Sequence, residues 1–139
     1  MDRIMGIDYG LKRIGIAMTD MLQITACPFD TIKSMSFKKD AVRLLEIAQK
    51  NDSSVMVFGL PINMNGTEGK MTNIVHKVIK EIRTISDIEV ATVDERLTTV
   101  QAERMLIEEY NISRDKRKNL KDQITAALIL QIYCYTLIK

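Results

Sequence analysis

Three acidic positions in this sequence have the residue types and the neighbours that suit a metal site. Asp8 follows the first apolar run of the chain, Asp94 and Glu95 end a later one, and Asp122 precedes the last. A carboxylate beside apolar residues needs a cation, a metal ion or hydrogen-bond donors. Carboxylates brought together repel, and each favours its protonated form unless a cation lies between them. Hard oxygen ligands suit Mg²⁺ or Mn²⁺, so a metal site is one chemistry that these positions allow.

Basic residues that could hold a phosphate backbone occur near the same positions. Residues 114–121 include five Lys or Arg and one Asp, a local excess of four positive charges, although the net charge of the chain is only +2. With Lys12, Arg13 and Arg96, this segment would position a nucleic acid through its phosphates. Metal ions held by the carboxylates would then support cleavage of a phosphodiester bond.

Each of these residues also has an ordinary structural explanation, and the pattern alone leaves both open. Asp8 could cap a turn at the end of a strand, and Glu95 could form a surface ion pair with Arg96. Asp122 could favour the positive end of a helix dipole. The basic run 114–121 could be a solvated face or loop.

The apolar periodicity predicts the elements that would position these side chains. Apolar runs and period-two patterns predict strands, and spacing of three and four predicts helices. We expect strands at 3–8, 13–19, within 23–31, at 54–59 and at 88–93. We expect helices after the cap Ser36, at 71–82, at 98–106 and at 124–138, with a polar connector at 111–119 and Asp122 in the first turn of the last helix.

These elements predict an α/β protein with a mixed five-stranded sheet and helices on both faces. Short connections make the first three strands an antiparallel meander, with Pro28 placing the third at an edge. The two later strands belong to βαβ units, which have parallel strands and right-handed crossovers. Ligands bind beyond the carboxyl ends of parallel strands, where Asp8 and the pair Asp94 and Glu95 would converge.

The composition fits a single domain over residues 1–139. A chain of this length buries one sizeable core, and 46% hydrophobic with 27% charged residues is typical of a globular protein. Two cysteines are too few for a disulfide framework, which favours the cytoplasm. We expect no signal peptide and no membrane span, because no apolar run approaches about 18 residues.

Four blocks of the chain resemble, in order, the motifs of the YqgF/RuvX family. The blocks are residues 6–17, 59–69, 94–99 and 121–131. The family comprises Holliday-junction-resolvase-like proteins that are regarded as nucleases maturing the 16S ribosomal RNA precursor. The sequence departs from the usual motif at Leu11, where the family has Thr, and at Asn65 and Val93.

The resemblance implies an RNase H-like fold and a metal-dependent nuclease that processes the 5′ end of pre-16S ribosomal RNA. By position, Asp8, Glu95 and Asp122 would be the catalytic residues and would bind Mg²⁺ or Mn²⁺, with Glu95 favoured over Asp94. The glycines that flank Asp8 would let a phosphate approach the ion. The residues that would contact nucleic acid are Lys12, Arg13, Asn63, Arg96, Lys116, Arg117 and Lys118.

The substrate and partners implied are RNA, with branched DNA as the alternative, and a ribosomal precursor particle, bound by a monomer or a homodimer. Two other functions of the same fold are a resolvase-like DNA nuclease and a nucleic-acid-binding module without catalysis. A fourth is an ATPase or sugar-kinase-like protein, which shares an Asp-x-Gly hairpin. That class binds nucleotide between two such domains, and 139 residues supply only one.

Overall fold

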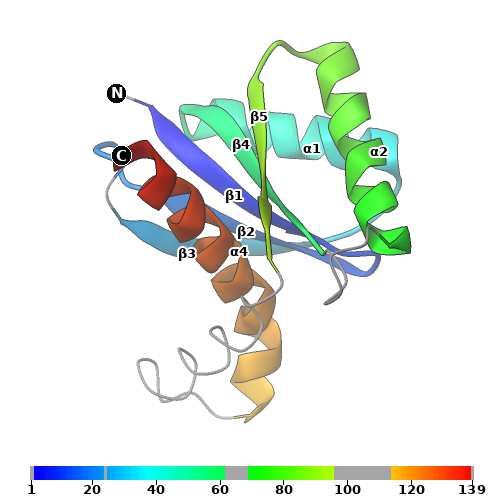
Figure 1. The fold of residues 1–139 in the computed structure, drawn as a ribbon. Coiled ribbons are helices and arrows are strands. Elements are labelled where there is room, and N and C mark those ends of the chain that lie inside the picture. The colour runs from blue at the N-terminus through cyan, green and yellow to red at the C-terminus, as the bar shows by residue number, and fades with distance from the viewer. Residues whose placement is uncertain (1, 24, 62–68, 96–113, 139) are drawn as a thin grey trace.

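The computed structural model describes residues 2–23, 25–61, 69–95 and 114–138. The described elements form a five-stranded sheet flanked by helices (Figure 1). In chain order they are β1 (Arg3–Tyr9), β2 (Arg13–Thr19), β3 (Ala26–Lys33), α1 (Phe37–Lys50), β4 (Ser53–Leu60), α2 (Lys70–Ile85), β5 (Glu89–Asp94) and α4 (Arg114–Ile138).

The sheet is mixed, as predicted, with the strand order β3-β2-β1-β4-β5. The meander β1–β2–β3 is antiparallel, whereas β4 runs parallel to β1 and β5 runs parallel to β4. Pro28 lies on the edge strand β3, where its missing N–H costs the sheet least. The expected strands are confirmed to within about two residues, and β3 extends further, to Lys33.

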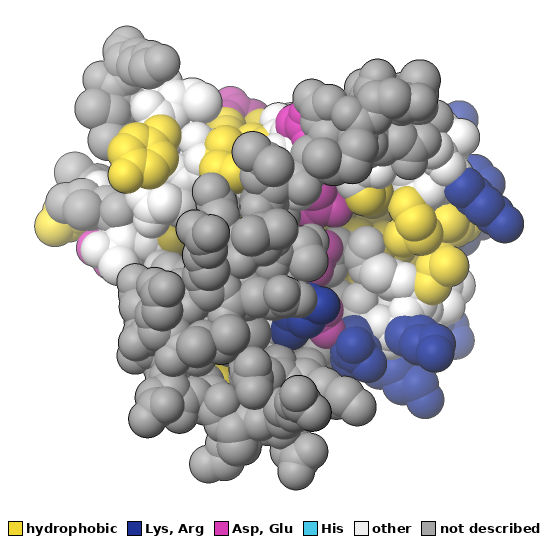
Figure 2. All heavy atoms as spheres, turned by 60° about the horizontal axis from the view of Figure 1, so that its bottom comes forward, with side chains coloured by type: hydrophobic (Ala, Val, Ile, Leu, Met, Phe, Trp, Pro, Cys, Tyr) yellow, Lys and Arg dark blue, Asp and Glu magenta, His cyan; other side chains and the backbone are white. Residues whose placement is uncertain are grey.

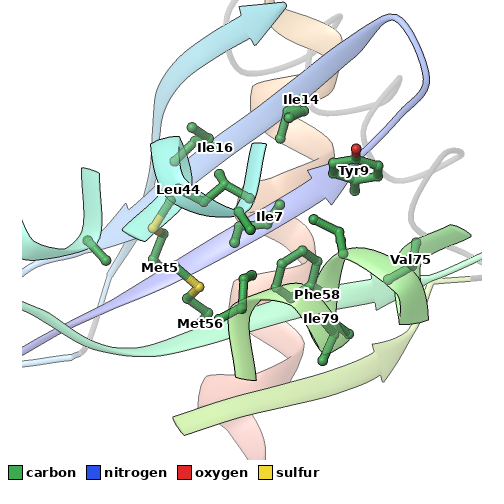
Figure 3. Packing of buried hydrophobic residues seen from close by; sticks show 14 of the residues in the cluster. Met5, Ile7, Tyr9, Ile14, Ile16, Leu44, Met56, Phe58, Val75 and Ile79 are labelled. Carbon is green, nitrogen blue, oxygen red and sulfur yellow. The ribbon is translucent and has the colours of Figure 1, made fainter. Parts of the chain in front are cut away.

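One face of the sheet packs against α1 and α2. Side chains alternate along β1, β2 and β4, so every second residue points into this core. Figure 3 shows Met5, Ile7, Phe58 and their neighbours meeting Leu44 from α1 and Ile79 from α2. The predicted cap of α1 is confirmed, because the Ser36 side chain accepts a hydrogen bond from the N–H of Lys39.

The other face packs against α4, and glycines let the helix backbone approach the strands. A Cβ atom added to Gly6 would lie 2.7 Å from the carbonyl oxygen of Ala126, and one added to Gly15 would overlap the carbonyl group of Asp122. Gly6 therefore gives room to α4, so the expectation that it exposes backbone to a phosphate is wrong. Helices thus cover both faces, as predicted (Figure 1).

The start of the last helix differs from the prediction. α4 begins at Arg114, so residues 114–119 are its first turns and not a connector. Lys, Arg and Leu are good helix formers, and a helix that is anchored by its buried part extends cooperatively beyond the sheet (Figure 1). Asp122 is therefore eight residues past the start of α4 and not in the first turn, which removes the helix dipole as its explanation.

Two further expectations concern the helix at 98–106 and the membrane. The helix expected at 98–106 lies outside the described residues. Of the helices that the structure describes, none is long and apolar enough to cross a membrane.

The close contact between α4 and the sheet can be tested with Gly15→Ala. The new methyl group would meet backbone atoms of Asp122, which cannot rotate away, so we expect a loss of about 1–3 kcal/mol in the free energy of unfolding. Urea unfolding measures the effect, and Cys27→Ala on the exposed edge strand is the control. A stability equal to that of the control would contradict the close contact.

Candidate functional site

The carboxyl ends of β1, β4 and β5 meet at one edge of the sheet, because the three strands are parallel. Asp8 lies near the end of β1 and pairs in register with Gly15 of β2. Glu95 follows β5, and its N–H donates a hydrogen bond to the carbonyl of Leu60 at 3.2 Å. This edge therefore holds the first two of the predicted carboxylates.

Helix α4 brings the third carboxylate to the same place. The backbone of Asp122 lies against Gly15, the residue that pairs with Asp8. Figure 2 shows acidic side chains in a row beside a group of Lys and Arg side chains on this side of the molecule. Asp8 from β1, Glu95 from the end of β5 and Asp122 from α4 thus form one acidic group, in which Glu95 and Asp122 lie close enough to act on the Asp8 carboxyl.

The electrostatics of Asp8 reflect this convergence. Burial raises the pKa of its carboxyl to about 8, and the nearby charges of Glu95 and Asp122 act in the same direction. Lys121, one residue before Asp122, lowers it. An ionised Asp8 is therefore unfavourable here unless a cation compensates its charge.

The structure separates Glu95 from Asp94. Alternate residues of β5 face α4, so Val93 and Glu95 point toward the helix while Asp94 is exposed. The Oε2 atom of Glu95 is buried, and it lies where a side chain on Gly59 would be. Burial and the charge of Asp94 raise the pKa of Glu95 to about 7. Glu95 is thus the member of the pair that faces Asp8.

Asp122 has a cationic partner in this structure. Nε of Arg13 donates a hydrogen bond to Oδ2 of Asp122 at 2.8 Å. Asp122 is 21% exposed and Arg13 is 58% exposed, so the ion pair lies at the surface side of the acidic group.

The acidic group suits a divalent cation by its donor set. All three side chains offer hard oxygen ligands, and a buried carboxylate with two acidic neighbours favours an ion between them. Within the part of the chain that the structure describes, however, no three Asp, Glu, His or Cys side chains already enclose one point. Arg13 contacts Asp122 through Oδ2, so this carboxylate oxygen already has a cationic partner.

A buried network behind Asp8 was not predicted from the sequence. Asp40 is fully buried, and it accepts hydrogen bonds from the Tyr9 hydroxyl at 2.6 Å, the Met35 N–H at 3.0 Å and Arg43 at 3.2 Å. Burial and the bond to Asp40 raise the pKa of Tyr9. The network ties the start of α1 to the end of β1. The sequence feature that could have indicated this network is Asp40 itself, an acidic residue four positions before the core residue Leu44.

The predicted contacts to nucleic acid are placed only in part. Lys12 and Arg13 are exposed at the turn from β1 to β2, beside the acidic group. Lys116, Arg117 and Lys118 lie on the first turns of α4. Their side chains, and the residues Asn63 and Arg96, lie outside the described part of the chain. Lys121 belongs to the predicted basic segment 114–121, but its effect on the pKa of Asp8 was not predicted.

Solved structures of nucleases share this fold. The chain superimposes on a fowlpox virus resolvase in complex with Holliday junction DNA, with a TM-score of 0.63 over 99% of both chains at 16% identity. RuvC of T. thermophilus, in complex with a Holliday junction substrate, has a TM-score of 0.59 at 14% identity over 98% of this chain and 96% of the other. These neighbours define the class: an α/β protein with the RNase H-like fold of resolvase nucleases.

Sequence comparison defines the family. The RuvX family model, described as Holliday junction resolvase, matches residues 2–135. A protein of Endomicrobium trichonymphae named "Putative pre-16S rRNA nuclease" is 68% identical over 96% of this chain and 95% of its own length. A protein of Thermoanaerobacter pseudethanolicus with the same name is 44% identical over 94% of both. The chain belongs to the RuvX family.

The burial of Asp8 predicts a pH-dependent stability in the absence of divalent cations. Its pKa is about 8 in the folded chain and near 3.8 when unfolded, so its contribution is full below pH 4 and is lost as the pH rises toward 8. Asp8→Asn cannot ionise, and we expect it to raise Tm at pH 8 and to flatten the decline from pH 5. Thermal unfolding in EDTA measures both effects. The exposed control Glu46→Gln should show the same dependence of Tm on pH as the parent protein. If the curve of Asp8→Asn ran parallel to that of the parent protein, Asp8 would not be the group that causes the decline.

Proposed function

We propose that this chain is a metal-dependent nuclease, a single domain over residues 1–139, that hydrolyses phosphodiester bonds in cytoplasmic processing of the 5′ end of pre-16S ribosomal RNA. The observation that carries the proposal is the convergence of Asp8, Glu95 and Asp122 at the carboxyl edge of the sheet. Membership of the RuvX family and the names of the relatives support it.

The three carboxylates would hold Mg²⁺ or Mn²⁺ in this proposal. When bound, such an ion supplies the charge that polarises a phosphate oxygen and activates water. Asp8 would be the central ligand, because its strand β1 lies between β2 and β4. Asp122 packs over Gly15 of β2, and Glu95 lies at Gly59 of β4. The Tyr9–Asp40 hydrogen bond keeps the end of β1, and with it Asp8, in place.

Arg13 would change partner when the ion binds. Asp122 would turn from Arg13 to the cation, and the exposed guanidinium would then be available to a phosphate of the substrate. Lys12 lies next to it and would add a second phosphate contact. The basic residues on the first turns of α4, Lys116, Arg117 and Lys118, would extend this surface.

A second candidate is a nuclease that acts on branched DNA. The fold similarity to two resolvases favours it, because the solved structures of both contain Holliday junction DNA. The chemistry at the acidic group would be the same, so only the choice of substrate separates the two candidates.

Cleavage assays test the proposal and its alternative together. With Mn²⁺ present, we expect cleavage of precursor ribosomal RNA in preference to a four-way DNA junction. Asp8→Asn, Glu95→Gln and Asp122→Asn should each lose more than the roughly 10- to 100-fold that loss of a second-shell partner costs at metal sites. Glu46→Gln is the matched control. Unchanged cleavage by folded Asp8→Asn would refute the site, and preference for the junction would favour the resolvase.

Metal binding can be measured without a substrate. We expect Mn²⁺ to raise Tm, and to do so more at pH 8 than at pH 5, because protons compete with the ion for the carboxylates. Asp8→Asn should abolish the shift, whereas Arg13→Gln should keep or enlarge it, since the competitor for Asp122 is gone. A shift of equal size in Asp8→Asn would place the ion elsewhere.

A further inference from the structure

A pocket of about 570 Å³ lies beside the acidic group, between the β1–β2 turn and the end of β3. Residues 11–13 form one wall and residues 31–34 the other. Arg13 belongs both to this pocket and to the ion pair with Asp122, so the pocket adjoins one of the three proposed metal ligands.

The lining of the pocket combines positive charge with apolar surface. Lys12, Arg13 and Lys33 supply three cations, and none of the lining residues that the structure describes is acidic. Leu11 is 62% exposed, and Ile32 packs its side chain against the core. A ligand that matches this lining combines negative charge with an apolar part.

Hydrogen bonds hold the two walls in place. The N–H of Ser34 donates to the carbonyl of Lys12 at 3.0 Å, and its hydroxyl donates to the carbonyl of Gly10 at 2.5 Å. Arg13 and Lys33 pair in register across β2 and β3. The pocket is therefore formed before any ligand arrives, and its volume lies within the range of small-molecule sites, about 300–1,000 Å³.

We propose that this pocket is a subsite for one unpaired nucleotide next to the phosphate that is cleaved. The inference rests on the proposed nuclease function. The base lies against the exposed Leu11, and the phosphates on either side contact Lys12 and Lys33. A base that is stacked and paired in a duplex cannot enter such a pocket. The backbone of a duplex would contact only the Lys and Arg side chains. The subsite thus selects single-stranded nucleic acid.

Binding to two labelled RNAs of one sequence, one single-stranded and one in a duplex, tests the subsite. Fluorescence anisotropy in EDTA reports binding without cleavage. We expect the parent protein to favour the single strand, and Leu11→Thr to weaken that binding about 3- to 10-fold while leaving duplex binding unchanged. Leu22→Thr is the matched control, because Leu22 is 61% exposed and follows the far end of β2.

The contribution of charge is tested separately. Lys33→Gln should reduce the slope of log affinity against log salt by about one for the single strand, as expected for one lost phosphate contact. Lys80→Gln, an exposed change on α2, is the control and should leave the slope unchanged.

The results separate the subsite from the proposed nuclease. The subsite is overturned if the parent protein does not bind the single strand, if Leu11→Thr resembles Leu22→Thr, or if it weakens both RNAs equally. Cleavage with Mn²⁺ is measured on the same proteins. A single-strand preference that depends on Leu11, without cleavage by the parent protein, would support the subsite and refute the nuclease. Cleavage by the parent protein, without a single-strand preference that depends on Leu11, would support the nuclease and refute the subsite.

Discussion

The packing of the α4 backbone against β1 and β2 is the contact on which the rest of the site depends. It is possible only because Gly6 and Gly15 have no side chain on that face, where a Cβ atom would meet backbone atoms of Ala126 and Asp122. The same contact buries the apolar cluster between α4 and the sheet, and it sets the position of Asp122 relative to Asp8. Stability and site geometry are therefore two results of one close approach.

The site that this contact creates is unfavourable in isolation. Asp8 is buried beside two other carboxylates, which opposes its ionisation. The apolar clusters on the two faces of the sheet stabilise the fold around it, and the hydrogen bond from Tyr9 to the buried Asp40 holds the same end of β1 from the opposite face. Such an arrangement of charge is typical of a site that binds a cation, since the ion relieves the repulsion that folding imposes.

Arg13 connects the acidic group to the basic surface. Its ion pair with Asp122 compensates one carboxylate in this structure, and its position in the wall of the neighbouring pocket brings it near any phosphate bound there. In the proposed nuclease, Arg13 would therefore respond to both the metal ion and the substrate. The acidic group and the exposed cations Lys12 and Arg13 lie side by side at the β1–β2 turn.

The sequence by itself determined the class of fold, the approximate strands, the edge position of Pro28 and the acidic residues at the strand ends, because each depends on local periodicity or on the known geometry of βαβ units. Only the tertiary structure decided that α4 begins at Arg114, that Glu95 and not Asp94 faces Asp8, and that Gly6 makes room for a helix. It also paired Arg13 with Asp122 and Tyr9 with Asp40. These features depend on how close distant segments approach, and no local pattern records that distance.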